Sequence, residues 1–302
     1  MTYPAHRWTA FEGPEVDAAV AQLKAEGYVI LRNRIDPQAV RGMNADFRAR
    51  FERTPFCKGN FYGGRTKRFS QVLKRTAHAE AFVRDPLILA VAEQVLGPWC
   101  ERIQLGLTQA IEMHPGSPTQ APHRDQEIYP GPRTGGIQYM INVMFPLTPY
   151  TRENGATLIW PGSHRADPDA MLDLDASVPM EMAPGDAVIW LGSTMHSGGA
   201  NRTSEIRRGL IVNYSLGWVK PFELNWLAYP PEVARHFDPV LAGLIGYCHH
   251  RPSIGMYDGR CPSILLGEDP VRDFLGTHDA MNRDQEARIG RWMEIEKARR
   301  AA

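Results

Sequence analysis

A histidine and an aspartate stand two positions apart in the segment APHRDQEIYP, residues 121–130. Imidazole and carboxylate groups bind divalent transition metals, so His123 and Asp125 could hold one ion if their side chains point the same way. In an extended backbone the side chains at positions i and i+2 lie on one face, and Arg124 between them points to the other. Pro122 favours an extended backbone because it fixes its own φ angle and restricts the residue before it. The segment therefore predicts half of a metal site.

A second H-x-D sequence, His236 to Asp238, shows that this spacing is weak evidence by itself. With ten histidines in the chain, chance alone supplies about half an H-x-D sequence. The surrounding segment EVARHFDPV is typical of a helix, where positions i and i+2 point about 200° apart. We therefore expect His236 and Asp238 not to share a metal.

A third ligand has to come from elsewhere in the chain, and His196 is the best candidate. It lies in a Gly/Ser-rich turn that follows a strand-like apolar run in GDAVIWLGSTMHSGGANRT. His114 and His164 fit less well, because EMHPGS and PGSHRADP are typical of turns. Two histidines and one carboxylate leave coordination positions open, which is typical of non-haem Fe(II) oxygenases rather than of structural zinc sites. A histidine that only makes structural hydrogen bonds is the alternative for His196.

The strand-like segment RRGLIVNYSLGW adds an arginine to the candidate site. Strict alternation gives it two faces, one made of Arg208, Leu210, Val212 and Tyr214 and the other of Arg207, Gly209, Ile211 and Asn213. A buried guanidinium without a partner is costly, so Arg208 on the more apolar face needs a carboxylate. A distant Asp or Glu is one source, and a bound dicarboxylate gripped through two hydrogen bonds is the functional alternative.

Composition limits the class of partner. The 302 residues include 34 Lys and Arg and 34 Asp and Glu, and this zero net charge gives no field that would attract nucleic acid, so we expect a small-molecule substrate. Cys57, Cys100, Cys248 and Cys261 are scattered and predict reduced thiols. The N-terminus has no signal-peptide pattern, and no run of about 18 apolar residues occurs, which predicts a cytoplasmic protein that does not insert into membranes.

The elements that must position these residues predict one domain over residues 1–302. A helical layer is expected over about 1–100, with helices at 14–26, 37–52 and 86–96, and a short β run at 28–31. From residue 103 the chain changes to short strands separated by Gly- and Pro-rich turns, without crossover helices between them. This pattern predicts a mainly β jelly-roll core over about 101–220.

The rest of the chain, about 221–302, is expected to be helical, with a first helix at about 230–246. The final segment NRDQEARIGRWMEIEKARRAA predicts a solvated helix. Its few apolar residues, Ile289, Trp292 and Met293, would contact the body or a second subunit, as in a homo-oligomer.

Several motifs in order resemble a known family. They are LKAEGYVILRNRI, QAPHRDQ, ENGATLIWPGSH, APGDAVIW, HSGGANRTSEIRRGLIVNYSLGWVKPFE, LIGY and YDGR. The chain resembles the phytanoyl-CoA dioxygenase (PhyH)-like family of Fe(II)/2-oxoglutarate-dependent oxygenases, and within it the branch of the meroterpenoid-biosynthetic dioxygenases. The resemblance covers most of the chain and implies a double-stranded β-helix (jelly roll, cupin-like) core.

The resemblance also implies roles for single residues. His123, Asp125 and His196 would bind the iron, and Arg208 would anchor the distal carboxylate of the cosubstrate 2-oxoglutarate. Gln120 and Thr157 match positions that hydrogen-bond this cosubstrate. Their structural alternatives are an amide at a strand end and a threonine paired across the sheet.

The reaction implied consumes O₂ and 2-oxoglutarate, releases succinate and CO₂, and oxidises an unactivated C–H bond. Hydroxylation is the default outcome, with desaturation, epoxidation or ring rearrangement as others. Asp125 argues against halogenation, because halogenating relatives carry a small residue there. The alternative functions are a non-oxidative metal-dependent jelly-roll enzyme, such as an isomerase or hydrolase, and a catalytically inactive binding member of the family.

The substrate is predicted to be a lipophilic small molecule. Residues 54–73 correspond to part of the family's lid over the substrate, although a surface loop with solvated charges is the alternative. Apolar side chains that could line the pocket, or belong to the core, are Tyr62, Phe69, Met140, Met144, Trp218 and Phe222.

Overall fold

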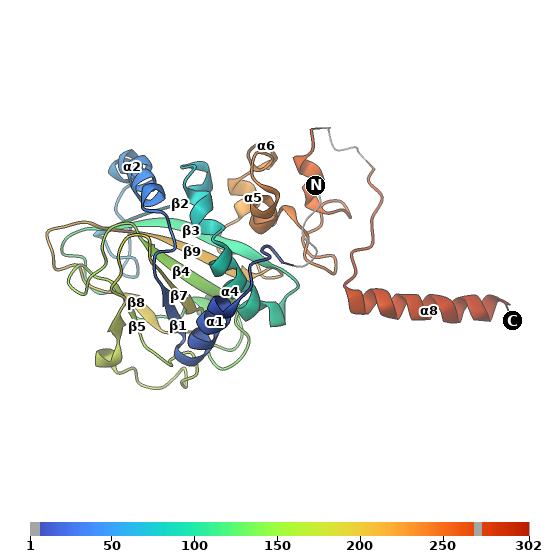
Figure 1. Cartoon of the computed structure of the whole chain (residues 1–302), viewed down its shortest axis with the longest axis horizontal. Coiled ribbons are helices and arrows are strands. Elements are labelled where there is room, and N and C mark those ends of the chain that lie inside the picture. The colour runs from blue at the N-terminus through green and yellow to red at the C-terminus, as the bar shows by residue number, and fades with distance from the viewer. Residues whose placement is uncertain (1–6, 269–273, 302) are drawn as a thin grey trace.

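The structure is a computed structural model that describes residues 7–268 and 274–301. Within these residues an antiparallel β core with flanking helices forms the body of the chain (Figure 1). The larger sheet has six strands in the order β1-β7-β4-β9-β3-β2, and the smaller has three in the order β6-β5-β8. The predicted jelly roll is therefore confirmed.

Short strands follow one another from residue 103, as predicted, while β2 is an addition and His196 begins a strand rather than lying in the predicted turn. The larger sheet contains β1 (Tyr28–Leu31), β2 (Thr66–Ser70), β3 (Ile103–Met113), β4 (Met140–Pro146), β7 (Ala187–Leu191) and β9 (Arg207–Leu216). The smaller contains β5 (Thr157–Ile159), β6 (Val178–Pro179) and β8 (His196–Gly198). The sequence did not predict β2, because its charged stretch TKRFS lacks a clear apolar alternation. It pairs with β3 and forms an edge of the larger sheet.

The predicted N-terminal helices are present as α1 (Pro14–Glu26), α2 (Pro37–Arg53) and α4 (Pro86–Leu96), with a short α3 (Ala79–Val83) before α4. The carboxylates of Asp36 and Asp85 accept backbone N–H bonds in the first turns of α2 and α4. Helix α1 ends at Gly27, whose φ of 83° is left-handed and thus suits glycine. Local capping therefore explains where these helices begin or end.

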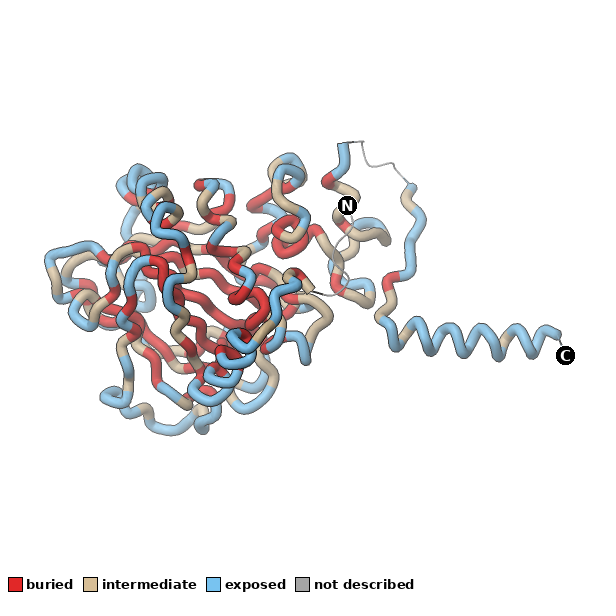
Figure 2. The backbone as a smooth tube through the Cα atoms, viewed as in Figure 1, coloured by how far each residue is buried: buried red, intermediate tan, exposed pale blue. Residues whose placement is uncertain are grey.

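Both faces of the larger sheet are buried. Leu210, Val212 and Tyr214 of β9 belong to the main core, together with residues of α1, α2 and α4. Ile211, on the opposite face of β9, packs against a second cluster inside the jelly roll. Figure 2 shows the strands buried between helices on one side and the loops and smaller sheet on the other. The inner face is therefore the one that can line a site.

The predicted helix over about 230–246 is wrong as a continuous element. The chain forms α5 (Asn225–Ala228), α6 (Pro231–Ala234) and α7 (Pro239–Ala242), followed by one irregular turn. Proline is the first residue of α6 and of α7. It cannot continue a preceding helix, because it has no backbone N–H to donate and its ring clashes with the preceding turn. Asp238 caps α7 by accepting a bond from Val240 N at 2.8 Å.

The predicted C-terminal helix is confirmed as α8 (Arg283–Ala301), which projects from the body (Figures 1 and 2). Ile289, Trp292 and Met293 are 44%, 56% and 56% exposed, so the predicted contact with the body is not formed within this chain. Among the described residues, no helix is both long enough and apolar enough to cross a membrane.

Candidate metal centre

The structure brings His123, Asp125 and His196 together, as the sequence predicted. One potential ligand atom from each lies within 4.8 Å of the others. His123 and His196 are cross-strand neighbours, and the backbone N–H of each donates to the other's carbonyl at 3.0 Å. Asp125 follows at the start of a short 3₁₀ turn. Antiparallel pairing thus places the His-x-Asp segment beside the end of β8.

The two imidazoles are oriented by backbone carbonyls. Nδ1 of His123 lies 2.9 Å from Ala121 O, and Nδ1 of His196 lies 3.1 Å from Thr194 O. A carbonyl only accepts hydrogen bonds, so each Nδ1 carries the proton and each Nε2 keeps its lone pair for a metal. These Nε2 atoms face the carboxylate of Asp125, at 3.5 Å for His123 and 3.2 Å for His196. The donor set therefore fits one divalent ion.

A chain of amides holds the Asp125 carboxylate from the other side. Asn142 Nδ2 donates to Asp125 Oδ2 at 2.8 Å, and Asn213 Nδ2 donates to Asn142 Oδ1 at 2.8 Å. Both asparagines are buried on the inner faces of β4 and β9. Asn142 was not predicted as a site residue, although a lone amide in the apolar run MINVMFP was the available signal. These two amides fix the orientation of the Asp125 carboxylate.

The charges of the cluster are complementary. Burial alone would raise the pKa of Asp125, but the imidazoles of His196 and His123 hold that pKa well below its usual range. Burial would lower the pKa of His123, and the carboxylate of Asp125 raises it above the usual value. Asp125 is thus ionised at neutral pH, which is the state that a metal ligand requires.

The cluster opens into a cavity of about 400 Å³ inside the jelly roll. Its walls are rich in apolar side chains: Phe61, Tyr62, Leu107, Ile111, Met113, Met140, Met144, Trp190, Ile211 and Phe222. Gln120 and Thr157, which were predicted beside the cosubstrate, also line it. Of the predicted apolar lining, Phe69 instead packs in the main core, and Trp218 donates its indole N–H to Trp99 O at 2.9 Å.

Arg208 does not line this cavity, contrary to its predicted role. Its Nη2 lies 2.7 Å from Glu112 Oε2, directly across the strand pair, and its guanidinium lies over the Phe51 ring of α2. The cavity contains the neighbouring Arg207, which is only 3% exposed. The carboxylate of Glu112 therefore pairs with Arg208, which is the alternative in which a distant Asp or Glu is its partner.

Arg207 has no carboxylate partner among the described residues. It stacks 4.5 Å over the ring of Tyr150 and donates to the carbonyl of Gly155. Its Nε is buried and has no hydrogen-bond partner in the part of the chain that the structure describes. The alternation predicted for β9 was right, but the choice of face was wrong, because the apolar face packs on helices and the other face lines the cavity. An orphaned buried guanidinium nitrogen fits a carboxylate ligand.

The remaining histidine motifs are structural. Asp238 of the second His-x-Asp caps α7, and its His236 is exposed, so this pair forms no site, as expected. His164 Nε2 lies 3.0 Å from the carbonyl of Lys24. Arg124 is buried and donates to the carbonyl of Ser193, which ties the His-x-Asp segment to the loop before His196. All four cysteines are free, as predicted.

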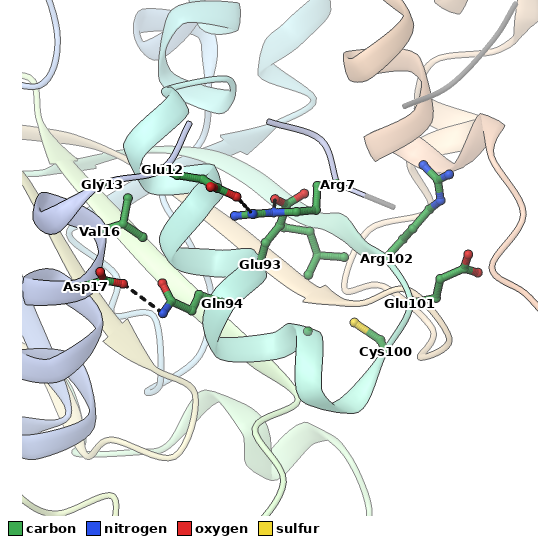
Figure 3. A pocket seen from close by; sticks show the side chains of 12 residues that line it. Arg7, Glu12, Gly13, Val16, Asp17, Glu93, Gln94, Cys100, Glu101 and Arg102 are labelled. Carbon is green, nitrogen blue, oxygen red and sulfur yellow. Dashed lines mark hydrogen bonds and ion pairs between the residues drawn. The ribbon is translucent and has the colours of Figure 1, made fainter. Parts of the chain in front are cut away.

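A second cavity, of about 780 Å³, lies outside the sheet between α1 and α4 (Figure 3). Charged and polar side chains line much of it, and Figure 3 shows several paired with each other. Arg7 pairs with Glu12 and Glu93, and Gln94 donates to Asp17. Because these groups satisfy one another, this cavity offers less to a ligand than the one inside the jelly roll.

The fold and the site together define a class: a jelly-roll protein with two histidines and one carboxylate that leave metal positions open. A model of the phytanoyl-CoA dioxygenase (PhyH) family matches residues 23–209, more than half of the chain. The chain therefore belongs to the PhyH family of Fe(II)/2-oxoglutarate-dependent oxygenases, which confirms the resemblance.

Curated relatives are similar over most of their length. Dioxygenase cdmD of Talaromyces verruculosus is 28% identical over 288 residues, covering 85% of this chain and 90% of the relative. Dioxygenase FrzG of Cladobotryum sp is 30% identical over 255 residues, covering 75% of this chain and 82% of the relative. Both names agree with an enzyme of the dioxygenase class.

Solved structures share the fold. The non-heme alpha-ketoglutarate-dependent epimerase SnoN from nogalamycin biosynthesis superposes with a TM-score of 0.56 at 22% identity, covering 67% of this chain and 81% of that one. HygX from Streptomyces hygroscopicus, solved with nickel and 2-oxoglutarate bound, gives 0.53 at 14% identity, covering 68% and 88%. At these identities the likeness concerns the jelly roll alone.

Proposed function

We propose that His123, Asp125 and His196 bind one Fe(II) ion in this protein. Two oriented imidazoles and an ionised carboxylate converge from two segments of the chain. Three protein ligands leave positions for a cosubstrate and O₂, which a closed structural zinc site would not.

2-Oxoglutarate is the cosubstrate, and Arg207, rather than Arg208, holds its distal carboxylate. The observation that carries this assignment is the buried guanidinium of Arg207, which lines the same cavity as the three ligands without an acid of its own among the described residues. Gln120 and Thr157 line that cavity too and would hydrogen-bond the cosubstrate. Together, bound iron and 2-oxoglutarate supply oxygen activation with release of succinate and CO₂.

The substrate is a lipophilic small molecule, and the outcome is oxidation of an unactivated C–H bond, most simply hydroxylation. The apolar walls of the cavity, including Met140, Met144 and Trp190, support a lipophilic substrate. They also keep water away from the metal and determine which hydrogen lies nearest to it. A structurally similar protein is named an epimerase, so product analysis has to include rearranged products.

The test is an anaerobic titration of the purified protein with Fe(II) and then 2-oxoglutarate. We expect a weak visible charge-transfer band on addition of 2-oxoglutarate, and succinate release once air is admitted. Asp125→Ala should abolish both. His236→Ala, in the second His-x-Asp sequence, is the matched control and should keep both because His236 is exposed.

The rival functions give different results in the same experiment. A non-oxidative isomerase or hydrolase on these ligands would bind metal but give neither the band nor succinate. An inactive binding member of the family could give the band, but it would release no succinate under air. Either result would contradict the proposal.

A further inference from the structure

A second arginine, Arg68, lines the same cavity from the edge strand β2. Its neighbour Phe69 packs into the main core, so alternation points Arg68 to the inner face. The residue across from Arg68 on β3 is Ile111, which also lines the cavity. The strand register therefore fixes a second guanidinium in the candidate site.

The guanidinium of Arg68 is oriented by its neighbours but has no carboxylate partner in the described part of the chain. It lies 4.8 Å over the ring of Tyr62, and its Nη1 donates to Gln109 Oε1 at 3.1 Å. Its Nε is buried and, within residues 7–268 and 274–301, has no hydrogen-bond partner. Burial lowers the pKa of Arg68, and the positive charge of Arg207 adds to this shift, while Cys57, Tyr62 and the carboxylate of Asp125 act against it. Asp125 is already committed to the metal.

Two other partly buried arginines, Arg208 and Arg34, have acids of their own. Arg208 pairs with Glu112, and Arg34 pairs with Asp85 at 2.9 Å. A positive charge kept in a largely apolar cavity without such a partner costs free energy unless a ligand neutralises it. Arg68 therefore has the surroundings of a ligand-binding group.

The cosubstrate does not account for Arg68. In the proposed function one carboxylate of 2-oxoglutarate goes to the metal and the other to Arg207, which is 3% exposed and deep in the cavity. Arg68 instead lies over the ring of Tyr62, which is 38% exposed and packs against the ring of Phe61, 44% exposed. The ring of Phe61 in turn lies 4.8 Å from that of His123.

We propose that the substrate is a lipophilic carboxylic acid whose carboxylate pairs with Arg68 while its hydrocarbon part occupies the apolar cavity. This inference rests on the proposed function, since it assumes that 2-oxoglutarate occupies Arg207. A planar guanidinium stacked on Tyr62 is already oriented for two parallel hydrogen bonds to a carboxylate. The pairing would also hold the hydrocarbon part in one orientation over the metal.

The test measures binding to the anaerobic Fe(II)–2-oxoglutarate protein by calorimetry. The probes are carboxylic acids and the alcohols of the same carbon skeleton: decanoic acid with decanol, and adamantane-1-carboxylic acid with adamantane-1-methanol. In the unmodified protein we expect at least one acid to bind about tenfold more tightly than its alcohol. Arg68→Met should remove this preference and leave the affinity for 2-oxoglutarate within about threefold.

A control variant separates the effect of losing Arg68 from a general effect of changing its segment. Arg65→Met removes an exposed guanidinium from the same segment and should keep the preference for acids. If Arg68→Met fails to fold, Arg68→Gln tests the same loss of charge while keeping a polar side chain.

Three results would overturn the inference. The unmodified protein could bind no acid better than its alcohol, or the preference could survive in the Arg68 variants. A loss of 2-oxoglutarate affinity of more than about tenfold in Arg68→Met would instead assign Arg68 to the cosubstrate. Failure of the proposed function is distinguishable, because then the unmodified protein would either give no charge-transfer band or release no succinate under air.

Discussion

Arg207 and Arg208 are neighbours on β9, yet they have opposite surroundings. Arg208 faces the helices, lies over Phe51 and pairs with the buried Glu112. Arg207 faces the inside of the jelly roll, where it contacts the ring of Tyr150 and the carbonyl of Gly155. Its own Nε has no hydrogen-bond partner among the described residues. A charge that the protein neutralises itself contributes to folding, whereas a charge left without an acid is available to a ligand.

The histidines divide in the same way. In His164 the Nε2 atom lies against a backbone carbonyl, and the ring belongs to no potential metal-binding cluster among the described residues. In His123 and His196 the Nδ1 atoms lie against carbonyls, so both Nε2 atoms remain for a metal. Convergence with a second imidazole and a carboxylate therefore distinguishes the candidate ligands from His164.

The largest expected effect comes from Arg207→Met. Removing the guanidinium takes away two charge-assisted hydrogen bonds to the cosubstrate, so the affinity for 2-oxoglutarate should fall by about 100-fold. Fe(II) affinity should change little, because Arg207 is not a metal ligand. A titration of the charge-transfer band measures the first value and calorimetry the second. Unchanged 2-oxoglutarate affinity would contradict the assignment of Arg207, rather than Arg208, to the cosubstrate.

Arg208→Met should instead reduce stability. Glu112 is 3% exposed and would lose its guanidinium partner, which we expect to cost about 2 kcal/mol in the free energy of unfolding. His114 Nε2, at 2.8 Å from Glu112 Oε1, still offers partial compensation. Urea denaturation measures this loss, and the double variant Arg208→Met, Glu112→Met should recover part of it. A loss of 2-oxoglutarate affinity in the folded variant would contradict this assignment.

Asn142→Leu should weaken metal binding without removing a ligand. Asp125 would lose the amide that orients it, and we expect Fe(II) affinity to fall by about tenfold. Asn44→Leu is the matched control, because its amide donates to Leu147 O at the outer side of the sheet. Competition with a chelator measures both affinities. Equal losses in the two variants would show that the effect is on folding alone.

The smallest effect concerns His164 and pH. Burial lowers the pKa of His164 in the folded protein, so the unfolded chain binds its proton more readily. The stability linked to this histidine is present above the unfolded pKa of about 6.5 and is lost as the pH falls below it. Between about pH 8 and pH 5.5, the free energy of unfolding of His164→Gln should therefore fall by about 0.5 kcal/mol less than that of the unmodified protein. Urea denaturation at the two pH values measures this difference. An unchanged pH dependence would contradict a buried neutral ring.

Local patterns were sufficient for part of the fold and the site. The predicted helices at 37–52 and 86–96 match α2 and α4. The His-x-Asp segment and His196 after its apolar run identified the three candidate ligands, although His196 begins strand β8 rather than lying in a turn. These features depend on neighbours in sequence, which the chain shows directly.

Features that depend on packing were harder to predict. Hydrophobicity could not show which of two buried faces of β9 lines the cavity, because helices cover the more apolar one. Arg68 became a site residue only through the register of β2 against β3, and Asn142 only through its bond to Asp125. Both contacts join segments far apart in the chain.

The most direct test is a crystal structure of the protein with Ni(II), which does not turn over, and 2-oxoglutarate. We predict one metal ion bound by Nε2 of His123, Nε2 of His196 and the carboxylate of Asp125, with the distal carboxylate of 2-oxoglutarate paired to Arg207. Arg208 should remain on Glu112. A metal bound elsewhere, or a distal carboxylate on any arginine other than Arg207, would contradict the account.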